Sequence, residues 1–598
     1  MQRSSLLRRV AGAAALVTAL ALAATAVHAP ALADDGDHSD ARKHGWITST
    51  IQQMTIEEKV GQLFSTHVYG NTVDSANPAN MAEFGLATPR EIIERYHLGG
   101  ILYFAWTHSV DNPVQAAGLS NGIQDVMSTT GAEIPGLISI DQEGGLVARL
   151  LEPATQTPGN MALGATRDEQ GARDLAAIQG EELAAIGVTQ NFAPVADVNV
   201  NPANPVIGVR SFGSDPDLAA ALTSAQVKGY EDDAGISAAA KHFPGHGDTA
   251  VDSHYGFPVI THTRAEWEAI DKPPFQAAID AGIDVIMTAH IQVPALDPSG
   301  DPATLSKPIL TGVLRGEMGY DGVIVTDSLG MAGVREKYGD PRVPVLALKA
   351  GVYILLNPPD MAAAYNGVLD AVKSGELTEK RIDESLYRLL DLKWRNGVVR
   401  APMVDESKVM DVVGTEDHLA RAQEVTDGSP TVVKNDEGTL PMAASGQKVL
   451  ITGYGVATKQ SLAGRIARRG AVTQVAATNT NPTDPQIAAA AEAAEDKDAV
   501  VVLTMNAADY PGQARLVEAL EATGTPVVVV AVRNPYDISE LTSAPTFVAT
   551  YSYKDVALES LTKVIYGEVP PRGKLPVDIP AKDDPSSTLF SFGTGLTW

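Results

Sequence analysis

The stretch "DGVIVTDSLGM" at residues 321–331 is a short apolar run that ends in polar residues. A run of this length and composition is typical of a buried β-strand. Similar runs recur along the chain, and each is separated from the next by a segment long enough for a helix. They are "VGQLFSTHV" (60–68), "GGILYFAW" (99–106), "GLISIDQEGG" (136–145), "VTQNFAPVADVN" (188–199), "ISAAAKHFPGHG" (236–247), "IDVIMTAHI" (283–291) and "VYILLNPPD" (352–360). Strands that alternate with helices in this number predict an α/β fold, a (β/α)8 TIM-like barrel over residues 45–396.

A second αβ pattern follows the barrel. Residues 397–430 contain no clear strand and are predicted to be a linker. From Thr431 onward, buried strands alternate with alanine-rich helices, and the strands are "KVLITGYG" (448–455), "AVVVLTMNA" (499–507), "TPVVVVAVRNP" (525–535) and "TFVATYSY" (546–553). The pattern predicts an αβα sandwich domain over residues 431–598, with helices on both faces of the sheet.

Composition limits the chemistry and the partners. The 598 residues include no cysteine, which excludes disulfides, thiolate metal sites and a cysteine nucleophile, so histidine and carboxylates must carry any reaction. The formal net charge of −28 repels phosphates over most of the surface. We therefore expect no nucleic-acid partner and no affinity for anionic membranes.

The first 33 residues have the pattern of an export signal. Arg3, Arg8 and Arg9 precede the apolar run "VAGAAALVTALALAATAV", and the small residues "ALA" at 31–33 precede an acidic segment. This order predicts a signal peptide over residues 1–33, cleavage near Asp34 and a secreted, extracellular protein without a membrane anchor. A retained membrane anchor is the alternative, and the arginine pair leaves the twin-arginine route open.

Polar residues lie at the ends of the predicted strands. Because the carboxyl ends of the strands form the active-site face of such a barrel, we expect these side chains to converge on one mouth. The residues are Asp141, Asn191, Lys241, His242, His290 and Asp327.

The most unusual of these segments is "KHFPGHGDTAVDSHYGFPVI" at residues 241–260, which combines several histidines and aspartates. A metal site is one interpretation, but catalytic metal sites usually take two ligands at helical spacing, whereas Pro244, Gly245 and Gly247 indicate a loop. In another interpretation the polar side chains only satisfy the backbone groups of that loop.

This segment closely resembles the signature of the β-N-acetylglucosaminidases of glycoside hydrolase family 3, in which Lys-His-Phe-Pro-Gly-His-Gly is followed by Asp-Ser-His. The resemblance continues in the same order along nearly the whole chain after the signal. The further motifs are "DQEGG" (141–145), "NFAPVADVN" (191–199), "VRSFG" (209–213), "VTDSLGM" (325–331), "VVKNDEGTLP" (432–441), "GKLPVDIP" (573–580) and "FGTGL" (592–596). It implies a barrel followed by an αβα sandwich, as predicted above, and no metal or cofactor.

The resemblance also implies catalytic roles. Asp327 matches the family's nucleophile, although an aspartate there can also cap the following helix. His254, in Asp-Ser-His, matches the acid/base, and a histidine, with an unperturbed pKa of roughly 6.5, can donate and accept a proton near neutral pH. Asp252 would orient the imidazole and stabilise its cation. His246 and Asp248 are expected to shape the loop.

The remaining matched residues form the expected sugar clamp. By resemblance, Asp141 and Arg149 bind hydroxyls of the non-reducing sugar, and Arg210, Lys241 and His242 complete the pocket. The chain departs from the family pattern at Tyr353, where relatives tend to have aspartate, and this departure puts a salt link at that position in doubt.

These residues predict a secreted, exo-acting β-N-acetylglucosaminidase that works with retention of configuration on carbohydrate, either cell-wall fragments or chitin oligosaccharides. A phosphorylase that passes the sugar to phosphate is an alternative within the family, because a neutral histidine repels phosphate less than a carboxylate does. A noncatalytic sugar-binding protein is a second alternative. β-Glucosidases of the family generally lack Asp-Ser-His in this loop, so the motif argues against that activity. The oligomeric state is not predicted.

Overall fold

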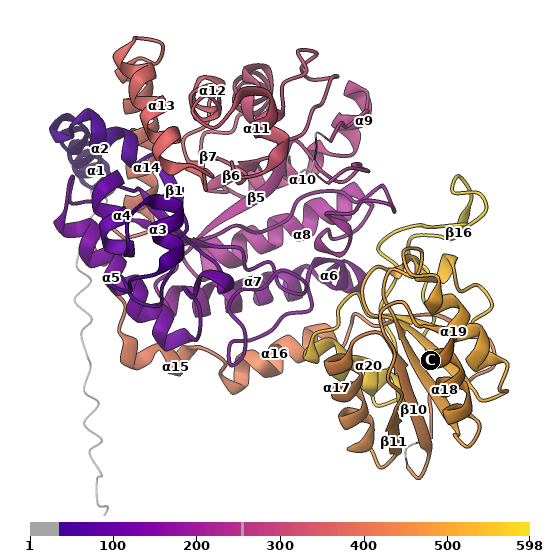
Figure 1. The fold of residues 1–598 in the computed structure, drawn as a ribbon. Helices are drawn as coiled ribbons and strands as arrows, with labels where there is room; N and C mark the ends of the chain where they lie inside the picture. The colour runs from indigo at the N-terminus through magenta and orange to yellow at the C-terminus, as the bar shows by residue number, and fades with distance from the viewer. Residues whose placement is uncertain (1–34, 253–255, 257, 444) are drawn as a thin grey trace, which may run out of the picture. The chain divides into compact units, whose positions relative to one another are not determined.

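The computed structural model describes residues 35–252, 256, 258–443 and 445–598 (Figure 1). The chain divides into two compact units, residues 1–46 and 47–598. Helix α1 (Asp35–Gln53) spans this division, and both large sheets belong to the second unit. In the part of the chain that is described, no helix is long and apolar enough to cross a bilayer.

The first sheet is the predicted barrel. Its eight strands are ordered β7-β6-β5-β4-β3-β2-β1-β8, the paired neighbours run parallel, and a bridge between Val325 and Ile354 joins the two ends. The (β/α)8 TIM-like prediction is confirmed, and each predicted run contains one strand. The strands are β1 (Phe64–Thr66), β2 (Gly100–Tyr103), β3 (Leu137–Ile140), β4 (Gln190–Asn191), β5 (Ser237–Phe243), β6 (Val285–Thr288), β7 (Val323–Thr326) and β8 (Leu355–Leu356).

Helices connect these strands in the order expected for a parallel barrel. Many begin at a Thr, Asp or Asn whose side chain accepts a backbone N–H of the first turn, and capping boxes occur at Thr55, Thr88 and Thr263. The helical segments are α2 (Ile56–Gly61), α3 (Pro78–Phe84), α4 (Pro89–Tyr96), η1 (Ala105–Thr107), α5 (Pro113–Thr129), α6 (Asn160–Thr166), α7 (Glu169–Ala185), η2 (Gly208–Arg210), α8 (Pro216–Lys228), η3 (Gly229–Asp233), α9 (Arg264–Ala269), α10 (Lys272–Asp280), η4 (Ala303–Leu305), η5 (Pro308–Glu317), α11 (Ala332–Tyr338), α12 (Val343–Ala350), α13 (Met361–Lys373) and α14 (Glu379–Arg395).

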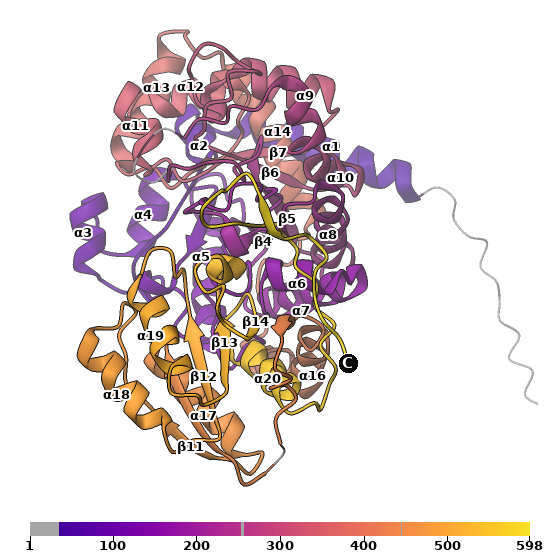
Figure 2. The ribbon, with the colours of Figure 1, turned by 90° about the vertical axis from the view of Figure 1, so that its right-hand side faces the viewer.

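The second sheet has six strands in the order β11-β10-β12-β13-β14-β9, parallel except for the antiparallel edge strand β9. Figure 2 labels β11, β12, β13 and β14 of this sheet. Valines of β12 alternate between two apolar clusters. Val500 and Val502 pack with α18 and α19, whereas Val501 packs with α17 and α20. Burial on both faces confirms the predicted sandwich.

The sequence interpretation did not identify β9 or β11 as strands. Strand β11 is an exposed edge in which only one of four residues is partly buried, so it lacks the apolar run that marks the central strands. The elements are β9 (Thr431–Asn435), β10 (Lys448–Gly453), α17 (Val456–Ala467), β11 (Val472–Val475), α18 (Asp484–Ala494), β12 (Ala499–Thr504), α19 (Gly512–Glu521), β13 (Val527–Ala531), η7 (Pro535–Ser539), β14 (Thr546–Ala549), α20 (Asp555–Ile565), β15 (Ile579–Pro580) and β16 (Thr588–Phe590).

The barrel and the sandwich share a seam. Arg167 at the end of α6 donates to the carbonyl oxygens of Lys574 and Leu575 at 2.9 and 2.8 Å. Gly213 lies so close to Pro576 that an added Cβ would stand 2.2 Å from its carbonyl oxygen. The segment between the two sheets, residues 397–430, contains η6 (Glu406–Lys408), α15 (Val409–Val412) and α16 (Glu416–Thr426).

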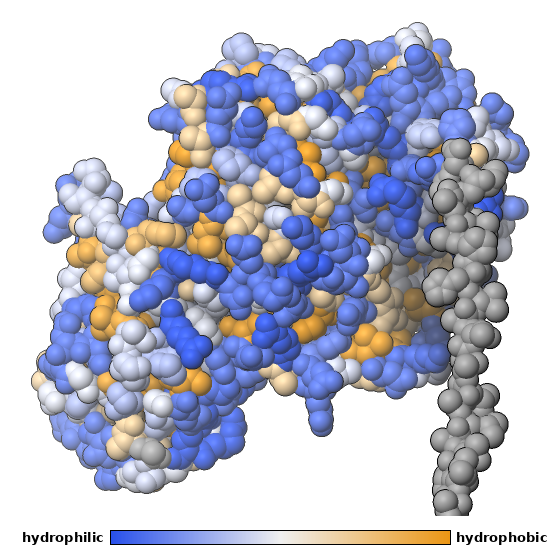
Figure 3. All heavy atoms as spheres, turned by 180° about the vertical axis from the view of Figure 1, so that it is seen from behind, coloured by the Kyte–Doolittle hydropathy of each residue, from blue (hydrophilic) through white to orange (hydrophobic). Residues whose placement is uncertain are grey.

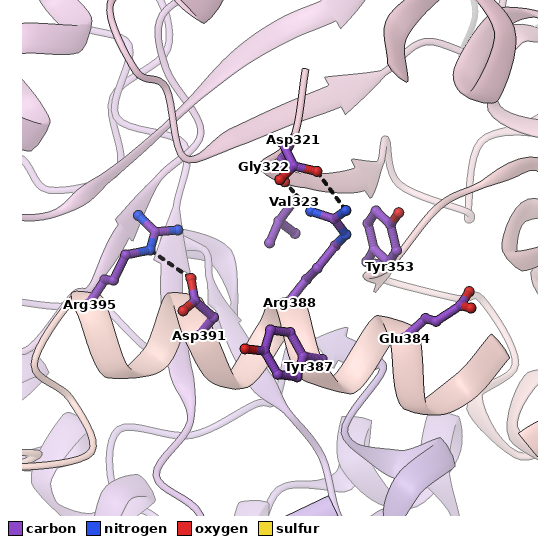
Figure 4. Close-up of a pocket in the computed structure, with 9 residues that line it drawn as sticks. All are labelled: Asp321, Gly322, Val323, Tyr353, Glu384, Tyr387, Arg388, Asp391 and Arg395. Atoms are coloured by element: carbon purple, nitrogen blue, oxygen red, sulfur yellow. Dashed lines mark hydrogen bonds and ion pairs between the residues drawn. The ribbon is translucent and has the colours of Figure 1, made fainter. Parts of the chain in front are cut away.

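Tyr353, the departure from the family pattern, lies beside Arg388 at the amino ends of β7 and β8 (Figure 4). The guanidinium carbons of Arg315, Arg381 and Arg388 lie 5.0, 5.1 and 5.4 Å from the centre of its ring, within the range of cation–π contacts. Arg388 also pairs with Asp321 at 2.6 Å. The aromatic ring of Tyr353 therefore contacts three guanidinium groups.

The outer surface carries mostly polar residues. The face drawn in Figure 3 is largely hydrophilic, with apolar residues in small groups between polar ones. Such scattering is normal for a folded domain in water.

Candidate active site

A cavity of about 590 Å³ opens at the carboxyl ends of the barrel strands. This is the face on which (β/α)8 enzymes carry their active sites. Its walls combine charged residues from strands β3 to β7 with aromatic residues that follow β2. They include Phe104, Trp106, Asp141, Glu143, Arg149, Arg210, Lys241, His242, His246, Asp327 and Asn357.

A network of ion pairs lies on one side of this cavity. Lys241 Nζ is 2.8 Å from Asp141 Oδ1 and 2.7 Å from Glu143 Oε1. Arg210 holds Glu143 with two nitrogens at 2.8 and 2.9 Å. Burial alone would raise the pKa of Glu143, but the two cations hold it far below its usual range. Glu143 is therefore ionised and fixes both cationic side chains in the wall.

Asp197 fixes the two histidines that begin the loop after β5. This fully buried carboxylate accepts the backbone N–H groups of His242 and His246 at 3.1 and 2.7 Å, and its Oδ2 is 2.7 Å from Nδ1 of His242. Burial would raise the pKa of Asp197, but the facing His242 lowers it overall. Burial also lowers the pKa of His246 to about 4, so that ring is neutral at ordinary pH.

Asp327 follows β7 and is partly exposed to the cavity. Its Oδ1 accepts the N–H of Ser328 at 2.7 Å. Burial raises its pKa, but His242, His290 and Lys241, together with that N–H, bring the pKa below its ordinary value. The side chain is thus an ionised carboxylate, which is the state that a nucleophile requires.

The expected acid/base segment is described only in part. His254 lies outside the described residues, whereas Asp252 is partly buried and its carbonyl oxygen accepts the N–H of Gly256 at 3.1 Å. Asp248 is held by His262, whose Nε2 lies 3.2 Å from Asp248 Oδ2 and whose Nδ1 lies 2.7 Å from Asp271 Oδ2. His262 therefore ties the start of this segment to the start of α10.

The six strand-end residues separate into two groups. Asp141, Lys241, His242 and Asp327 line the cavity, and so do Arg149 and Arg210. Asn191 and His290 are fully buried and do not line it. Asn191 exchanges hydrogen bonds with the backbone of Gln142, and His290 lies 2.8 Å from Thr304 Oγ1 and 2.9 Å from the Ser328 carbonyl. Both brace the backbone beside cavity residues.

Among the charged residues of the site, the sequence analysis missed Glu143, which lines the cavity, and Asp197, which is buried behind His242 and His246. Both stand in quoted motifs, "DQEGG" and "NFAPVADVN", so the motifs themselves carried the signal. The sequence did not show that Glu143 as well as Asp141 faces the cavity, because this depends on the direction of the chain after β3. There Gly144 and Gly145 adopt φ values of +85° and +54° and turn the backbone back along the wall.

Within the described ranges, no three His, Asp or Glu side chains come together in an arrangement that could hold a metal ion. Asp141 and Glu143 of the cavity are instead paired with Lys241 and Arg210, and the buried Asp197 is paired with His242.

Comparison with known proteins identifies the family. Residues 55–392 match the glycosyl hydrolase family 3 N-terminal domain, and residues 430–598 match the glycosyl hydrolase family 3 C-terminal domain. The chain belongs to glycoside hydrolase family 3, an enzyme family, and the resemblance noted in the sequence is confirmed.

Individual relatives agree over most of the chain. Beta-hexosaminidase A of Pseudoalteromonas piscicida is 36% identical over 550 residues, which cover 82% of this chain and 90% of the relative. A beta-N-acetylglucosaminidase/beta-glucosidase of Cellulomonas fimi is 29% identical over 564 residues, 89% of this chain and 95% of the relative. The solved structure of a family 3 beta-N-acetylglucosaminidase from Paenibacillus sp. str. FPU-7 has 36% identity and a TM-score of 0.78, covering 88% of this chain and 99% of that one.

Proposed function

We propose that this family 3 hydrolase is a secreted, exo-acting β-N-acetylglucosaminidase that removes terminal N-acetylglucosamine with retention of configuration. The observation that carries the proposal is the ionised Asp327 in the same cavity as the Asp141–Lys241–Glu143–Arg210 network. A nucleophilic carboxylate beside fixed donors and acceptors is the arrangement that a retaining glycosidase needs. The names of the 36%-identical relatives support the N-acetylhexosaminide as substrate.

The reaction proceeds in two displacements. Asp327 attacks the anomeric carbon while His254 gives a proton to the leaving oxygen, which yields a glycosyl–enzyme ester and a free alcohol. His254 then takes a proton from water, and the resulting hydroxide attacks the anomeric carbon and releases Asp327. Two inversions restore the original β configuration. Asp252 keeps the imidazole in the required orientation.

The sugar is held by the charged wall. Asp141 and Lys241 are paired with each other, and Arg210 is paired with Glu143, so their remaining hydrogen-bonding positions are fixed before substrate arrives. His242, oriented by Asp197, and Arg149 complete the set. Fixed donors and acceptors bind sugar hydroxyls with little ordering cost.

We place the natural substrate outside the cell, as cell-wall fragments or chitin oligosaccharides. The arginine-led apolar run and the "ALA" site at residues 31–33 support export. N-terminal sequencing of the protein recovered from culture medium tests this, and we expect a chain that begins near Asp34. An intact N-terminus in the cell fraction would contradict it.

The activity is tested by NMR on an aryl N-acetyl-β-glucosaminide, with and without phosphate. We expect β-N-acetylglucosamine as the first product in both buffers. A sugar 1-phosphate would make the enzyme a phosphorylase, and release of the α anomer would exclude the two-step mechanism. Asp327→Asn should lower kcat by at least about 10³-fold. Asp321→Asn is the matched control, because Asp321 lies before the same strand but at the opposite end of the barrel, where its side chain is 87% exposed.

A further inference from the structure

Trp106 is an exposed aromatic residue on the wall of the active-site cavity. It lies in the short turn η1 directly after β2, and its side chain is 55% exposed although it lines the cavity. Phe104, which lines the same cavity, stacks against it with 5.1 Å between ring centres and 26° between planes. An indole held flat against a second ring presents a fixed apolar surface to whatever occupies the cavity.

The indole is supported from several sides. His67 and Tyr69 contact it edge-on, with ring centres at 5.0 and 5.5 Å. His67 is buried and is itself held, with Nδ1 2.5 Å from Asn357 Oδ1 and Nε2 3.2 Å from Glu83 Oε2. These contacts restrict the orientation of Trp106 without covering it. An ordered indole that remains 55% exposed can stack with little loss of side-chain entropy.

The cavity is divided chemically between two sets of walls. The residues that follow β3, β4 and β5 are charged and paired with one another, whereas the residues that follow β2 offer aromatic faces. The charged walls suit the hydroxyls of one sugar ring. The aromatic wall instead matches the C–H face of a second ring.

We propose that Trp106, backed by Phe104 and His67, is the stacking platform for the second sugar ring of the substrate, the residue joined to the terminal N-acetylglucosamine. This inference rests on the proposed function and adds to it a preference for di- and oligosaccharides over glycosides with small leaving groups. The ligand class is a pyranose whose axial hydrogens form a flat apolar face. The ring of Trp106 contributes binding energy only through its contact with the leaving group, the second sugar.

The test compares two substrates on Trp106→Ala and Trp106→Phe. The first is the β-1,4-linked disaccharide of N-acetylglucosamine, and the second is methyl N-acetyl-β-glucosaminide, which has no second ring. Trp106→Ala should lower kcat/KM for the disaccharide about tenfold, the loss expected for one stacked ring. The methyl glycoside should be hydrolysed within about twofold of the wild-type rate, and Trp106→Phe should recover most of the loss.

Trp598→Ala is the matched control, because Trp598 is another exposed tryptophan, 43% exposed, at the end of the chain. It should leave both substrates unaffected. An equal loss on both substrates would assign Trp106 a general role in shaping the cavity and would overturn the platform. Unchanged hydrolysis of the disaccharide by Trp106→Ala would overturn it as well.

A binding measurement separates this inference from the proposed activity. In Asp327→Ala, the disaccharide should quench tryptophan fluorescence, and Trp106→Phe in the same background should abolish that change. Quenching that persists without Trp106 would contradict the platform. If the wild-type enzyme cleaved neither glycoside, the proposed function would fail, while the fluorescence titration would still decide whether Trp106 stacks on a sugar.

Discussion

Asp197 and His242 form a buried pair in which Oδ2 of the carboxylate lies 2.7 Å from Nδ1 of the ring. Because a carboxylate only accepts hydrogen bonds, Nδ1 carries a proton, and Nε2 is the atom that lies 3.3 Å from Arg210 beside the cavity. The second carboxylate oxygen accepts the backbone N–H groups of His242 and His246. A single side chain thus sets the path of the backbone and the orientation of one imidazole.

Replacing this carboxylate should damage catalysis more than folding. Asp197→Asn retains the size of the side chain but can place an N–H against Nδ1, which reverses the tautomer of His242. We expect kcat/KM to fall by about 10- to 100-fold, as for other residues that orient an imidazole. Asp297→Asn provides the control, since Asp297 is also buried and also accepts a backbone N–H, that of Ser299. Similar losses in both variants would argue against a positioning role.

Glu143→Gln should reduce stability. Removal of the buried carboxylate charge leaves Arg210 without its carboxylate partner and Lys241 with Asp141 alone, and breaking a buried ion pair typically costs about 3–5 kcal/mol. Urea unfolding at pH 7 measures the loss. The pKa of Glu143 is lowered in the folded state, so its contribution is complete above the unfolded pKa, roughly 4.3, and declines as pH falls below it. The destabilisation should therefore shrink in acid.

His262 should contribute to folding stability with a pH dependence opposite to that of Glu143. Its hydrogen bond to Asp271, with help from Asp248 and Glu266, raises its pKa. The stabilisation is complete below the unfolded pKa, roughly 6.5, and is lost as pH rises through the folded value. The wild-type protein should exceed His262→Gln in Tm by more at pH 5.5 than at pH 9. His108→Gln is the control, because that histidine is largely exposed and pairs with Asp111 on the surface. A difference in Tm that does not change with pH would refute the ionic link.

Lys393→Met should stabilise the protein. Lys393 is buried on α14, and burial lowers its pKa to about 7, while its Nζ donates to Gln62 Oε1 at 2.9 Å. Below pH 7 the lysine is protonated in both folded and unfolded states, so the folded state bears the full cost of burying the charge. That cost falls as pH rises toward the unfolded pKa.

Since replacement also leaves Gln62 Oε1 unpaired, we expect a net gain of about 2 kcal/mol at pH 6 that declines by pH 9. Urea unfolding at the two pH values measures it. The partly exposed Lys349, which pairs with Glu376 at 3.0 Å, offers Lys349→Met as a comparison without such a gain. A loss of stability at pH 6 in Lys393→Met would contradict the prediction. It would mean that the surroundings of the buried ammonium group offset its desolvation cost more fully than the hydrogen bond to Gln62 alone would.

The barrel could be predicted from the sequence because its central strands are buried on both sides and therefore read as continuous apolar runs. Strand β7 is a clear instance, with four buried residues in "VIVT" followed directly by Asp327. Strand β11 could not be predicted in the same way, since its side chains lie mostly in water and "VTQV" lacks the continuous apolar run of the central strands.

The cavity residues could be predicted less completely. Position at a strand end does not fix the direction of a side chain, so Asn191 and His290 satisfied the sequence criterion and yet brace the backbone. The sequence around Trp106 does not indicate whether this residue lines the cavity or lies on the outer surface. Its role depends on contacts with His67 and Phe104, which only the folded chain brings together.

The seam between the two domains bears on how substrate enters. Ser214 donates to the Pro576 carbonyl at 2.9 Å, and Gly213 beside it leaves no space for even a methyl group against the same oxygen. Met161 and Ala165 of the barrel share one apolar cluster with Leu575 and Val577 of the sandwich. Such a joint resists sliding and rotation, because closely packed interiors do not deform continuously. We therefore expect the sandwich to stay fixed against the barrel, so that substrate enters and product leaves past the loops at the strand ends.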